Sequence, residues 1–358
     1  MSLATLILAG GSGTRLWPAS RAATPKQYLS FDGGPSYLQQ ALLRARAVAS
    51  DLTVVVTAED QVEAVATQHA ALGAAAGGEA CCIVGEPAAR NTAPAIALGA
   101  RVAARLSGSA ADPALLVLSS DHAIEPEEAF VSDVRAGQRL AQQGWLTTFG
   151  IRPTRPETGY GYLELGAELS DGFQVAAFHE KPDRETAGRF LAAGGFLWNA
   201  GIFLFPLELL TTELQCHAAE IAAALERTAV PLPAAGRGPA IVAPTPELRA
   251  TYRDLAAISI DYALMERSSR VAAVRASFRW SDVGSWDELA RIATGDAPVA
   301  ETEARRNTVF SDLPVALAGV DDLVVVVRNG AVLVTRKGRT QLVRDAVEGL
   351  RERRPDLL

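Results

Sequence analysis

The chain has 358 residues, 49% of them hydrophobic, which is enough for one large α/β domain and a smaller appendage. Its net charge of −7 argues against a nucleic-acid binder, because such proteins usually carry a basic patch that neutralises phosphates. No apolar run approaches the roughly 18 to 20 residues of a membrane span, and the N-terminus lacks a signal-peptide pattern. We therefore expect a cytoplasmic protein with no membrane and no nucleic-acid partner.

Short apolar runs alternate with longer helical patterns through the first half of the chain. The expected strands are Leu3 to Leu8, Leu52 to Thr57, Ala80 to Val84, Leu115 to Ser119 and Leu146 to Ile151. The expected helices are Tyr37 to Val48, Glu59 to Leu72, Thr92 to Leu106 and Glu127 to Gln143. This alternation predicts an α/β fold, with a Rossmann-like, mixed but mostly parallel sheet and helices on both faces. Ligands of such sheets bind at the carboxyl ends of the strands.

The second half of the chain has a different pattern. Extra strands are expected at 160–165, 173–182 and 197–205, and residues 230–247 read as a surface loop. From residue 294 the composition changes again, which predicts a catalytic domain over 1–293 and a small β-rich domain over 294–358. That domain should contain a hairpin turned at Asn329-Gly330 and end in a helix, roughly Gln341 to Arg353.

The most informative segment is the loop after the first strand. Glycines stand at Gly10, Gly11 and Gly13, followed by Arg15 and Lys26. Glycines allow a tight bend and a close approach to a ligand, and the loop N–H groups can then point at phosphate oxygens. Only 3 of the 34 basic residues are lysines, so Lys26 suggests a local need for a compact ammonium group. The loop is predicted to bind a polyphosphate.

Two better-known phosphate loops do not match this segment. A P-loop requires Gly-Lys five residues after its first glycine, but Arg15 stands five residues after Gly10 and Leu16 five after Gly11. A dinucleotide fingerprint starting at Gly11 would need its third glycine at Leu16. An NAD-dependent dehydrogenase is therefore disfavoured.

Two aspartates are candidate metal ligands. Asp121 ends the run LLVLSSD, so its carboxylate should emerge at the carboxyl edge of the sheet, and Asp282 comes from the distant segment WSDVGSWDEL. Magnesium commonly takes one or two carboxylates and leaves its other positions to water and phosphate oxygens. An aspartate after a strand is, however, also a common turn or cap residue.

Nine segments in order resemble the bacterial mannose-1-phosphate guanylyltransferases, a family of sugar-1-phosphate nucleotidyltransferases. They are LAGGSGTRLWP, TPKQYL, EPAARNTAPAIALGA, SSDH, ETGYGYLE, HEKPD, FLWNAGIFLF, SIDYALMER and WSDVGSWDEL. The C-terminal region resembles the short β-helix-like domain of this family but is shortened between Thr294 and Val315. The resemblance suggests a homodimer, while the shortening leaves the oligomeric state open.

The resemblance implies a role for each matching residue. Gly10, Gly11 and Arg15 would bind the triphosphate, and Lys26 would contact phosphate near the reacting centre, which makes Arg15 and Lys26 the catalytic pair. The guanine pocket would include Asn91 and Thr92, and Mg²⁺ would be bound by Asp121 and Asp282. Mannose 1-phosphate would be bound by Gly159, Glu180, Lys181, Asn199 and Asp261.

The implied reaction transfers GMP from GTP to α-D-mannose 1-phosphate, giving GDP-mannose for polysaccharide biosynthesis and pyrophosphate, by Mg²⁺-dependent in-line displacement. The alternatives are thymidylyl or adenylyl transfer to glucose 1-phosphate, and a noncatalytic sugar-nucleotide sensor. Many relatives carry a fused phosphomannose isomerase, for which 358 residues leave no room, so we expect transferase activity alone.

Overall fold

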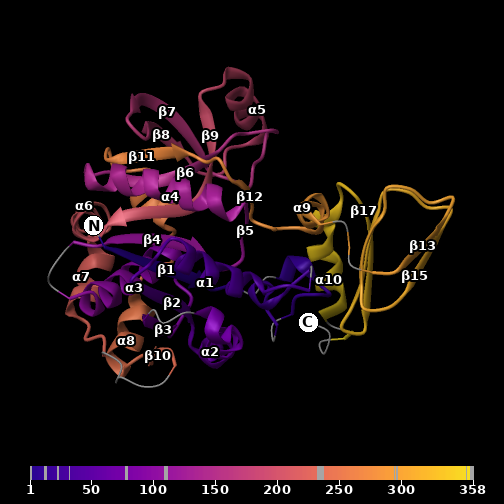
Figure 1. Ribbon diagram of the computed structural model, residues 1–358, viewed down its shortest axis with the longest axis horizontal. Helices are drawn as coiled ribbons and strands as arrows, with labels where there is room; N and C mark the ends of the chain where they lie inside the picture. The colour runs from indigo at the N-terminus through magenta and orange to yellow at the C-terminus, as the bar shows by residue number, and fades with distance from the viewer. Residues whose placement is uncertain are drawn as a thin grey trace. The chain divides into compact units, whose positions relative to one another are not determined.

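The computed structural model describes residues 2–11, 14–21, 24–31, 33–76, 80–108, 112–231, 238–293, 295, 297–351 and 353–354. Packing divides the chain into two compact units, whose elements are labelled in Figure 1. Unit 1 comprises Met1–Gly10, Ala41–Ser120 and Ile124–Trp280, and unit 2 comprises Gly11–Gln40, Asp121–Ala123 and Ser281–Leu358. The expected domain boundary at 293/294 stays a prediction, and residue 294 lies outside the described residues.

Unit 1 is built on a ten-stranded sheet with the order β10-β3-β2-β1-β4-β9-β6-β11-β8-β7. Its strands are β1 (Leu3–Ala9), β2 (Leu52–Ala58), β3 (Ala80–Glu86), β4 (Ala114–Ser119), β6 (Leu146–Ile151), β7 (Tyr162–Leu169), β8 (Gly172–His179), β9 (Phe196–Pro206), β10 (Ala240–Val242) and β11 (Val271–Arg275). The five strands from β10 to β4 run parallel, and β9 is antiparallel to both β4 and β6. The predicted mixed sheet is confirmed, and each strand expected in the first half of the chain forms.

Strand β1 is the switch point of this sheet. It pairs with β2 on one side and with β4 on the other, so the chain builds outward in both directions from β1. The backbone N–H of Ser120, just after β4, donates to the carbonyl of Leu8 in β1 at 3.0 Å. The carboxyl ends of β1 and β4 are therefore adjacent, which is the usual ligand-binding position on such sheets.

Helices cover both faces of the sheet. The helices of unit 1 are α2 (Val62–Ala71), α3 (Thr92–Leu106), α4 (Glu127–Gln142), α5 (Arg184–Ala193), α6 (Leu207–His217), α7 (Ala219–Arg227) and α8 (Pro246–Asp254), and α1 (Tyr37–Ala47) has residues in both units. Gly99 of α3 packs against Leu6, on the face of the sheet that α6, α7 and α8 also cover. Gly85 faces Val62 of α2 on the other face, where α4 also packs.

The segment 230–247 differs from its prediction. Residues Ala240–Val242 form the parallel edge strand β10 beside β3, and α8 begins at Pro246, while 232–237 lie outside the described residues. Three apolar residues among prolines and glycines give no strand signal in the sequence. They form a strand here because β3 offers them a free edge.

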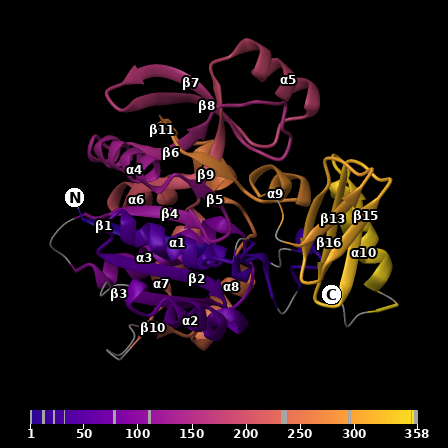
Figure 2. The same ribbon diagram turned by 45° about the vertical axis from the view of Figure 1, so that its right-hand side comes forward.

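Unit 2 contains a small coil of strands that ends in a hairpin. The strands are β13 (Val299–Thr302), β14 (Thr308–Ser311), β15 (Val315–Ala318), β16 (Leu323–Arg328) and β17 (Ala331–Arg336). The pairs β13–β15 and β14–β16 are parallel, whereas β17 is antiparallel to β16. Val299 pairs with Val315 and Thr308 pairs with Val324, so in both cases the partner lies one coil of 16 residues further along the chain. Figure 2 shows β13, β15 and β16 as neighbouring layers in orange to yellow. This architecture confirms the predicted β-helix-like domain, and the segment expected to be shortened still contributes β13 and β14.

A second hydrophobic core holds unit 2 together. Helices α9 (Trp286–Ile292) and α10 (Val343–Arg351) pack with residues of the N-terminal loop and of strands β14, β16 and β17. Trp286 is fully buried, and its ring lies 5.7 Å from that of Phe31 and 5.2 Å from that of Phe310. The predicted turn at Asn329-Gly330 and the predicted C-terminal helix are both present.

Two short strands, β5 (Ala123–Glu125) and β12 (Arg279–Ser281), contain residues of both units. Among the described residues, every helix is too short or too polar to cross a bilayer.

Candidate functional site

The glycine loop begins where β1 ends. Gly10 follows the buried strand, and Gly11 has a φ of +105°, a conformation that favours glycine. An added Cβ at either glycine would meet no atom of a described residue within 4 Å. Residues 12 and 13, including the predicted Gly13, lie outside the described residues. Arg15 is exposed and directly precedes the buried Leu16.

Lys26 contacts both predicted metal ligands, Asp121 and Asp282, inside unit 2. Its side chain is 6% exposed, and its Nζ donates to Asp121 Oδ2 at 2.9 Å and to the backbone carbonyl of Asp282. Tyr37 adds its ring face at 5.9 Å from the ammonium. Residues 95 and 256 positions away along the chain therefore solvate one buried cation.

Asp121 is held in its charged form. Burial acts to raise its pKa, but the positive charges of Lys26 and His122, with the Lys26 hydrogen bond, lower the pKa below its ordinary value of 3.8. Its side chain keeps 34% exposure, so one side of the carboxylate faces solvent. Asp121 is thus an accessible anion at neutral pH.

The Asp282 side chain folds back over the backbone of Gly284. A Cβ at Gly284 would stand 2.7 Å from Asp282 Oδ2, and the Gly284 N–H donates to Asp282 Oδ1 at 3.3 Å. Within the described residues, no group of three or more His, Cys, Asp or Glu side chains could bind a metal. Two carboxylates are of the chemical type that Mg²⁺ takes beside phosphate oxygens, so the residue types present fit such an ion. The contact that joins the two segments runs through Lys26 to the Asp282 backbone carbonyl.

Four of the predicted sugar-phosphate residues meet in unit 1. Asn199 on β9 accepts from Thr148 Oγ1 at 2.8 Å and donates through Nδ2 to Asp261 Oδ1 at 3.0 Å. Glu180 is 6% exposed and accepts from Lys181 Nζ at 2.6 Å, while Lys181 itself is 58% exposed. An ammonium with this exposure can reach a ligand while its partner stays buried.

Asp261 has the most strongly shifted pKa in this group. Burial, and then the negative charge of Glu180, raise its pKa from 3.8 to about 6. Lys181 opposes this shift, and its own pKa is raised despite burial because Glu180 and Asp261 favour its charged form. A carboxyl group whose pKa is shifted by burial and by a specific charge partner is a candidate functional residue.

Gly159 belongs to the loop beside this cluster. Its N–H donates to Glu157 Oε1 at 3.2 Å, and the loop is tied to β9 by the Asn199 N–H, which donates to the Gly161 carbonyl at 2.8 Å. A Cβ at Gly161 would stand 2.7 Å from Glu180 Oε2, so this glycine permits the close approach of the carboxylate. The predicted sugar residues are thus joined by backbone as well as side-chain contacts.

Asn91 and Thr92 form the start of α3. Asn91 adopts a φ of +66° and its side chain accepts from the Thr92 N–H at 2.8 Å, which caps the helix. The Thr92 hydroxyl accepts from the Ile260 N–H at 2.9 Å, one residue before Asp261. The predicted guanine and sugar residues of unit 1 are therefore linked through one short segment.

Glu86 is a candidate that the sequence motif contained but did not single out. It ends β3, burial raises its pKa to about 7, and a hydrogen bond from Tyr252 partly opposes this. Its Oε1 is buried and has no partner among the described residues. The Tyr252 hydroxyl also lies 3.3 Å from the carbonyl of Pro94, the alternative acceptor for its single hydrogen, so Tyr252 connects Glu86 to the first turn of α3. The sequence signal that could have identified Glu86 is its position at the end of a strand, shortly before the N-cap of α3.

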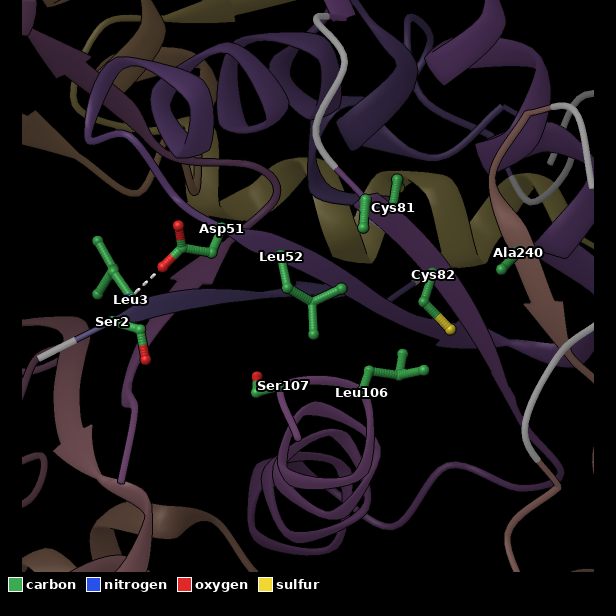
Figure 3. A pocket seen from close by; sticks show the side chains of 10 residues that line it. Ser2, Leu3, Asp51, Leu52, Cys81, Cys82, Leu106, Ser107 and Ala240 are labelled. Atoms are coloured by element: carbon green, nitrogen blue, oxygen red, sulfur yellow. Dashed lines mark hydrogen bonds between the residues drawn. The ribbon is translucent and has the colours of Figure 1, made fainter. Parts of the chain in front are cut away.

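A separate cavity opens at the opposite, amino-terminal edge of the sheet (Figure 3). It is lined at the starts of β1, β2 and β3 and at the end of α3, and none of its lining residues is a lysine or arginine. Its one carboxylate, Asp51, already accepts from the Leu3 N–H at 3.1 Å. This lining lacks the cations that a phosphate would require.

Comparison with known proteins identifies the family. The nucleotidyl transferase model matches residues 4–297, and the model of the mannose-phosphate isomerase/GMP-like β-helix domain matches 303–350. A mannose-1-phosphate guanylyltransferase of Klebsiella pneumoniae is 38% identical over 98% of this chain and 74% of its own length. The chain belongs to the mannose-1-phosphate guanylyltransferase family.

Two further relatives agree with this membership. The xanthan biosynthesis protein XanB of Xanthomonas campestris is 38% identical over 97% of this chain and 73% of its own length. The crystal structure described as a mannose-1-phosphate geranyltransferase from Thermus thermophilus superimposes with a TM-score of 0.81, at 31% identity, covering 98% of this chain and 99% of the other. Members of the nucleotidyl transferase family generally use a divalent metal and act on sugar phosphates and nucleoside triphosphates.

The raised pKa of Asp261 makes a prediction about stability. Because its pKa is about 6 in the folded protein and about 3.8 when unfolded, its contribution to stability is complete below pH 4 and is lost as the pH rises through 6. Asp261→Asn should therefore be more stable than the native chain at pH 7.5, by at most about 3 kcal/mol, and equally stable near pH 4. Urea unfolding at both pH values measures this.

The control is Asp183→Asn, which changes an exposed carboxylate at the N-cap of α5. Hydrogen bonds from Thr186 lower the pKa of Asp183, so this variant should gain no stability at pH 7.5. A stability difference for Asp261→Asn that is the same at pH 4 and pH 7.5 would contradict the shift.

Proposed function

We propose that this chain transfers GMP from GTP to α-D-mannose 1-phosphate, giving GDP-mannose and pyrophosphate. The observation that carries the proposal is the convergence of Lys26, Asp121 and Asp282 in unit 2 in a chain of this family. The Asn199, Asp261, Glu180 and Lys181 cluster of unit 1 supports a sugar-phosphate role. Since the reaction consumes GTP, we place it in the cytoplasm.

The chemistry needs charge neutralisation more than proton transfer. A sugar phosphate has a second pKa of about 6, so its attacking oxygen is already ionised near neutral pH and no strong general base is required. In the proposal Arg15, Lys26 and the loop amides neutralise the triphosphate, which favours the charge that develops as pyrophosphate leaves. Lys26 is suited to this role because Asp121 and Asp282 fix its ammonium in advance.

We assign the divalent ion to Asp121 and Asp282 and take it to be Mg²⁺. When bound, such an ion would neutralise phosphate charge and orient the reacting oxygens. The lowered pKa of Asp121 supports this role, because a metal ligand must be deprotonated.

In the same proposal Asn91 and Thr92 lie beside guanine, and the Glu86 carboxylate accepts hydrogen bonds from the base. Guanine presents two adjacent N–H donors, at N1 and N2, whereas adenine has an acceptor at N1. A carboxylate with an unpartnered buried oxygen matches guanine and not adenine. Those hydrogen bonds would also stabilise the charged form of Glu86, whose pKa burial raises.

A substrate panel tests the reaction. GTP, ATP, UTP and dTTP are each combined with mannose 1-phosphate and glucose 1-phosphate, and pyrophosphate release is measured with and without Mg²⁺. We expect the highest kcat/KM for GTP with mannose 1-phosphate and no release after chelation of the metal. A higher kcat/KM for another pair of substrates would contradict the proposed specificity. GTP binding without release of pyrophosphate from any pair would favour a noncatalytic sensor.

The catalytic residues have their own test. Arg15→Ala and Asp121→Ala should each lower turnover by about a hundredfold or more, since each removes one electrostatic partner of the phosphates. Asp121→Asn is the companion variant, because it keeps an oxygen acceptor for the buried Lys26. The control is Arg139→Ala, which removes an exposed cation paired with Asp171 on the surface of α4 and should leave turnover unchanged. Near-normal turnover in Arg15→Ala or Asp121→Ala, with an unchanged circular-dichroism spectrum, would contradict the assignment.

A homodimer is the assembly that we propose, with β17 at the interface. Val332 and Val334 project from this strand with 60% and 58% exposure, and within the described residues β17 pairs with β16 alone. An exposed apolar edge strand is a surface suited to pairing with a second copy. The double change of Val332 and Val334 to Lys should convert a dimer to a monomer in sedimentation velocity, while Leu191→Lys on α5 should not. A native chain that sediments as a monomer would refute the dimer.

A further inference from the structure

The hairpin turn between β16 and β17 contacts the N-terminal loop inside unit 2. Asn329 and Gly330 adopt φ values of +52° and +72°, and they connect the paired residues Arg328 and Ala331. Asparagine and glycine are the residues that tolerate such a turn best. The turn itself uses only the backbone of Asn329, so its carboxamide is available for other contacts.

That carboxamide binds the segment that follows Arg15. Asn329 Nδ2 donates to the carbonyl of Pro18 at 3.1 Å and to the carbonyl of Ala19 at 3.2 Å. In return, the Arg21 guanidinium donates to the backbone carbonyl of Asn329. Residues more than 300 positions apart are thus joined by reciprocal hydrogen bonds.

A second donor of unit 2 holds the same segment. Trp286 Nε1 donates to the carbonyl of Trp17 at 2.9 Å, so three consecutive carbonyls, those of residues 17, 18 and 19, accept from side chains of the C-terminal part of the chain. Buried backbone carbonyls need such partners, since an unsatisfied one is costly. Regular secondary structure does not provide them in this turn.

The segment transmits its position to Arg15 through the backbone. The N–H groups of Ala19 and Ser20 both donate to the Leu16 carbonyl, at 2.9 and 3.0 Å, which closes a tight turn. Leu16 is fully buried in the core that also contains Trp286 and Ala331. Arg15 precedes Leu16 directly and is exposed, so the orientation of its main chain follows from this turn.

We infer that Asn329 is a positioning residue of the nucleotidyl transfer: its carboxamide holds the Trp17–Arg21 turn, and through it Arg15, in the geometry that binds the triphosphate of GTP. The inference rests on the proposed function of Arg15. It gives the C-terminal β-domain a part in GTP binding, in addition to any part in assembly. A displacement of about 1 Å at a positioned group can lower the rate by about a hundredfold. The loss of a hydrogen bond that positions Arg15 indirectly can therefore change GTP binding.

The test removes the carboxamide and keeps the turn. Asn329→Gly retains the positive φ, since glycine tolerates it, and deletes both donated hydrogen bonds. Asn329→Asp also tolerates the turn but places a carboxylate against two carbonyl oxygens. We expect KM for GTP to rise about tenfold in Asn329→Gly and further in Asn329→Asp, with KM for mannose 1-phosphate changed less than twofold.

Asn307→Ala is the matched control. Asn307 lies in the same β-domain, where its Nδ2 donates to the Val320 carbonyl at 3.0 Å and its Oδ1 accepts from the Leu323 N–H at 2.9 Å. Its loss weakens the coil without touching the N-terminal segment. A general loss of stability lowers the active fraction and hence kcat, whereas KM for GTP should stay native in this control.

Hydrogen exchange of the Ala19 and Ser20 amides gives a readout independent of activity. Exchange at these amides should become faster in Asn329→Gly and stay native in Asn307→Ala. Native exchange together with native KM for GTP in Asn329→Gly would overturn the inference, even with a fully active native enzyme. A native chain that releases no pyrophosphate from any substrate pair would refute the proposed function instead, and the exchange rates would still decide whether Asn329 holds the turn.

Discussion

The arrangement of the candidate phosphate and metal residues depends on the contacts of one buried ammonium group, that of Lys26. A buried cation is tolerated only when anionic or carbonyl oxygens replace its lost water. Asp121 and the carbonyl of Asp282 do so here, and they belong to segments that lie far from Lys26 in the chain. The same contact keeps Asp121 charged, because the positive charge beside it outweighs the effect of burial on its pKa. One ion pair thus fixes the lysine that we propose for phosphate and keeps charged the carboxylate that we propose for the metal.

In the candidate sugar-phosphate cluster of unit 1 the pKa of the buried aspartate is shifted the other way, upward. Glu180 and Asp261 share the single charge of Lys181, so burial and mutual repulsion raise the pKa of Asp261. This arrangement is unfavourable for the free protein at neutral pH. In our proposal the hydroxyl groups of the sugar would donate hydrogen bonds to these carboxylates and so stabilise their charged forms. Buried groups with pKa values shifted by a specific charge partner cluster at functional sites.

The two units also differ in how they hold their functional residues. In unit 1 the residues follow the ends of strands and the cap of α3, so the sheet itself orients them. In unit 2 the loop that carries Arg15 has no regular structure over Trp17–Arg21, and side chains of Asn329 and Trp286 satisfy its carbonyls. Side chains of the C-terminal part of the chain therefore supply the hydrogen bonds to this loop's carbonyls that neighbouring strands supply in a sheet.

The sequence by itself determined the positions of the strands in the first half, the glycine loop and the candidate residues, because apolar periodicity, glycine spacing and family motifs are local properties of the chain. The order of the strands in the sheet came from the tertiary structure. It did not indicate β10, whose three residues become a strand only beside β3. Nor did it single out Glu86, whose pKa depends on burial by residues distant in sequence. Which cations and carboxylates meet, and that Asn329 reaches the carbonyls after Arg15, were decided by tertiary structure alone. Such contacts join residues up to 311 positions apart, and no local pattern records which of many equivalent polar groups will be brought within hydrogen-bonding distance.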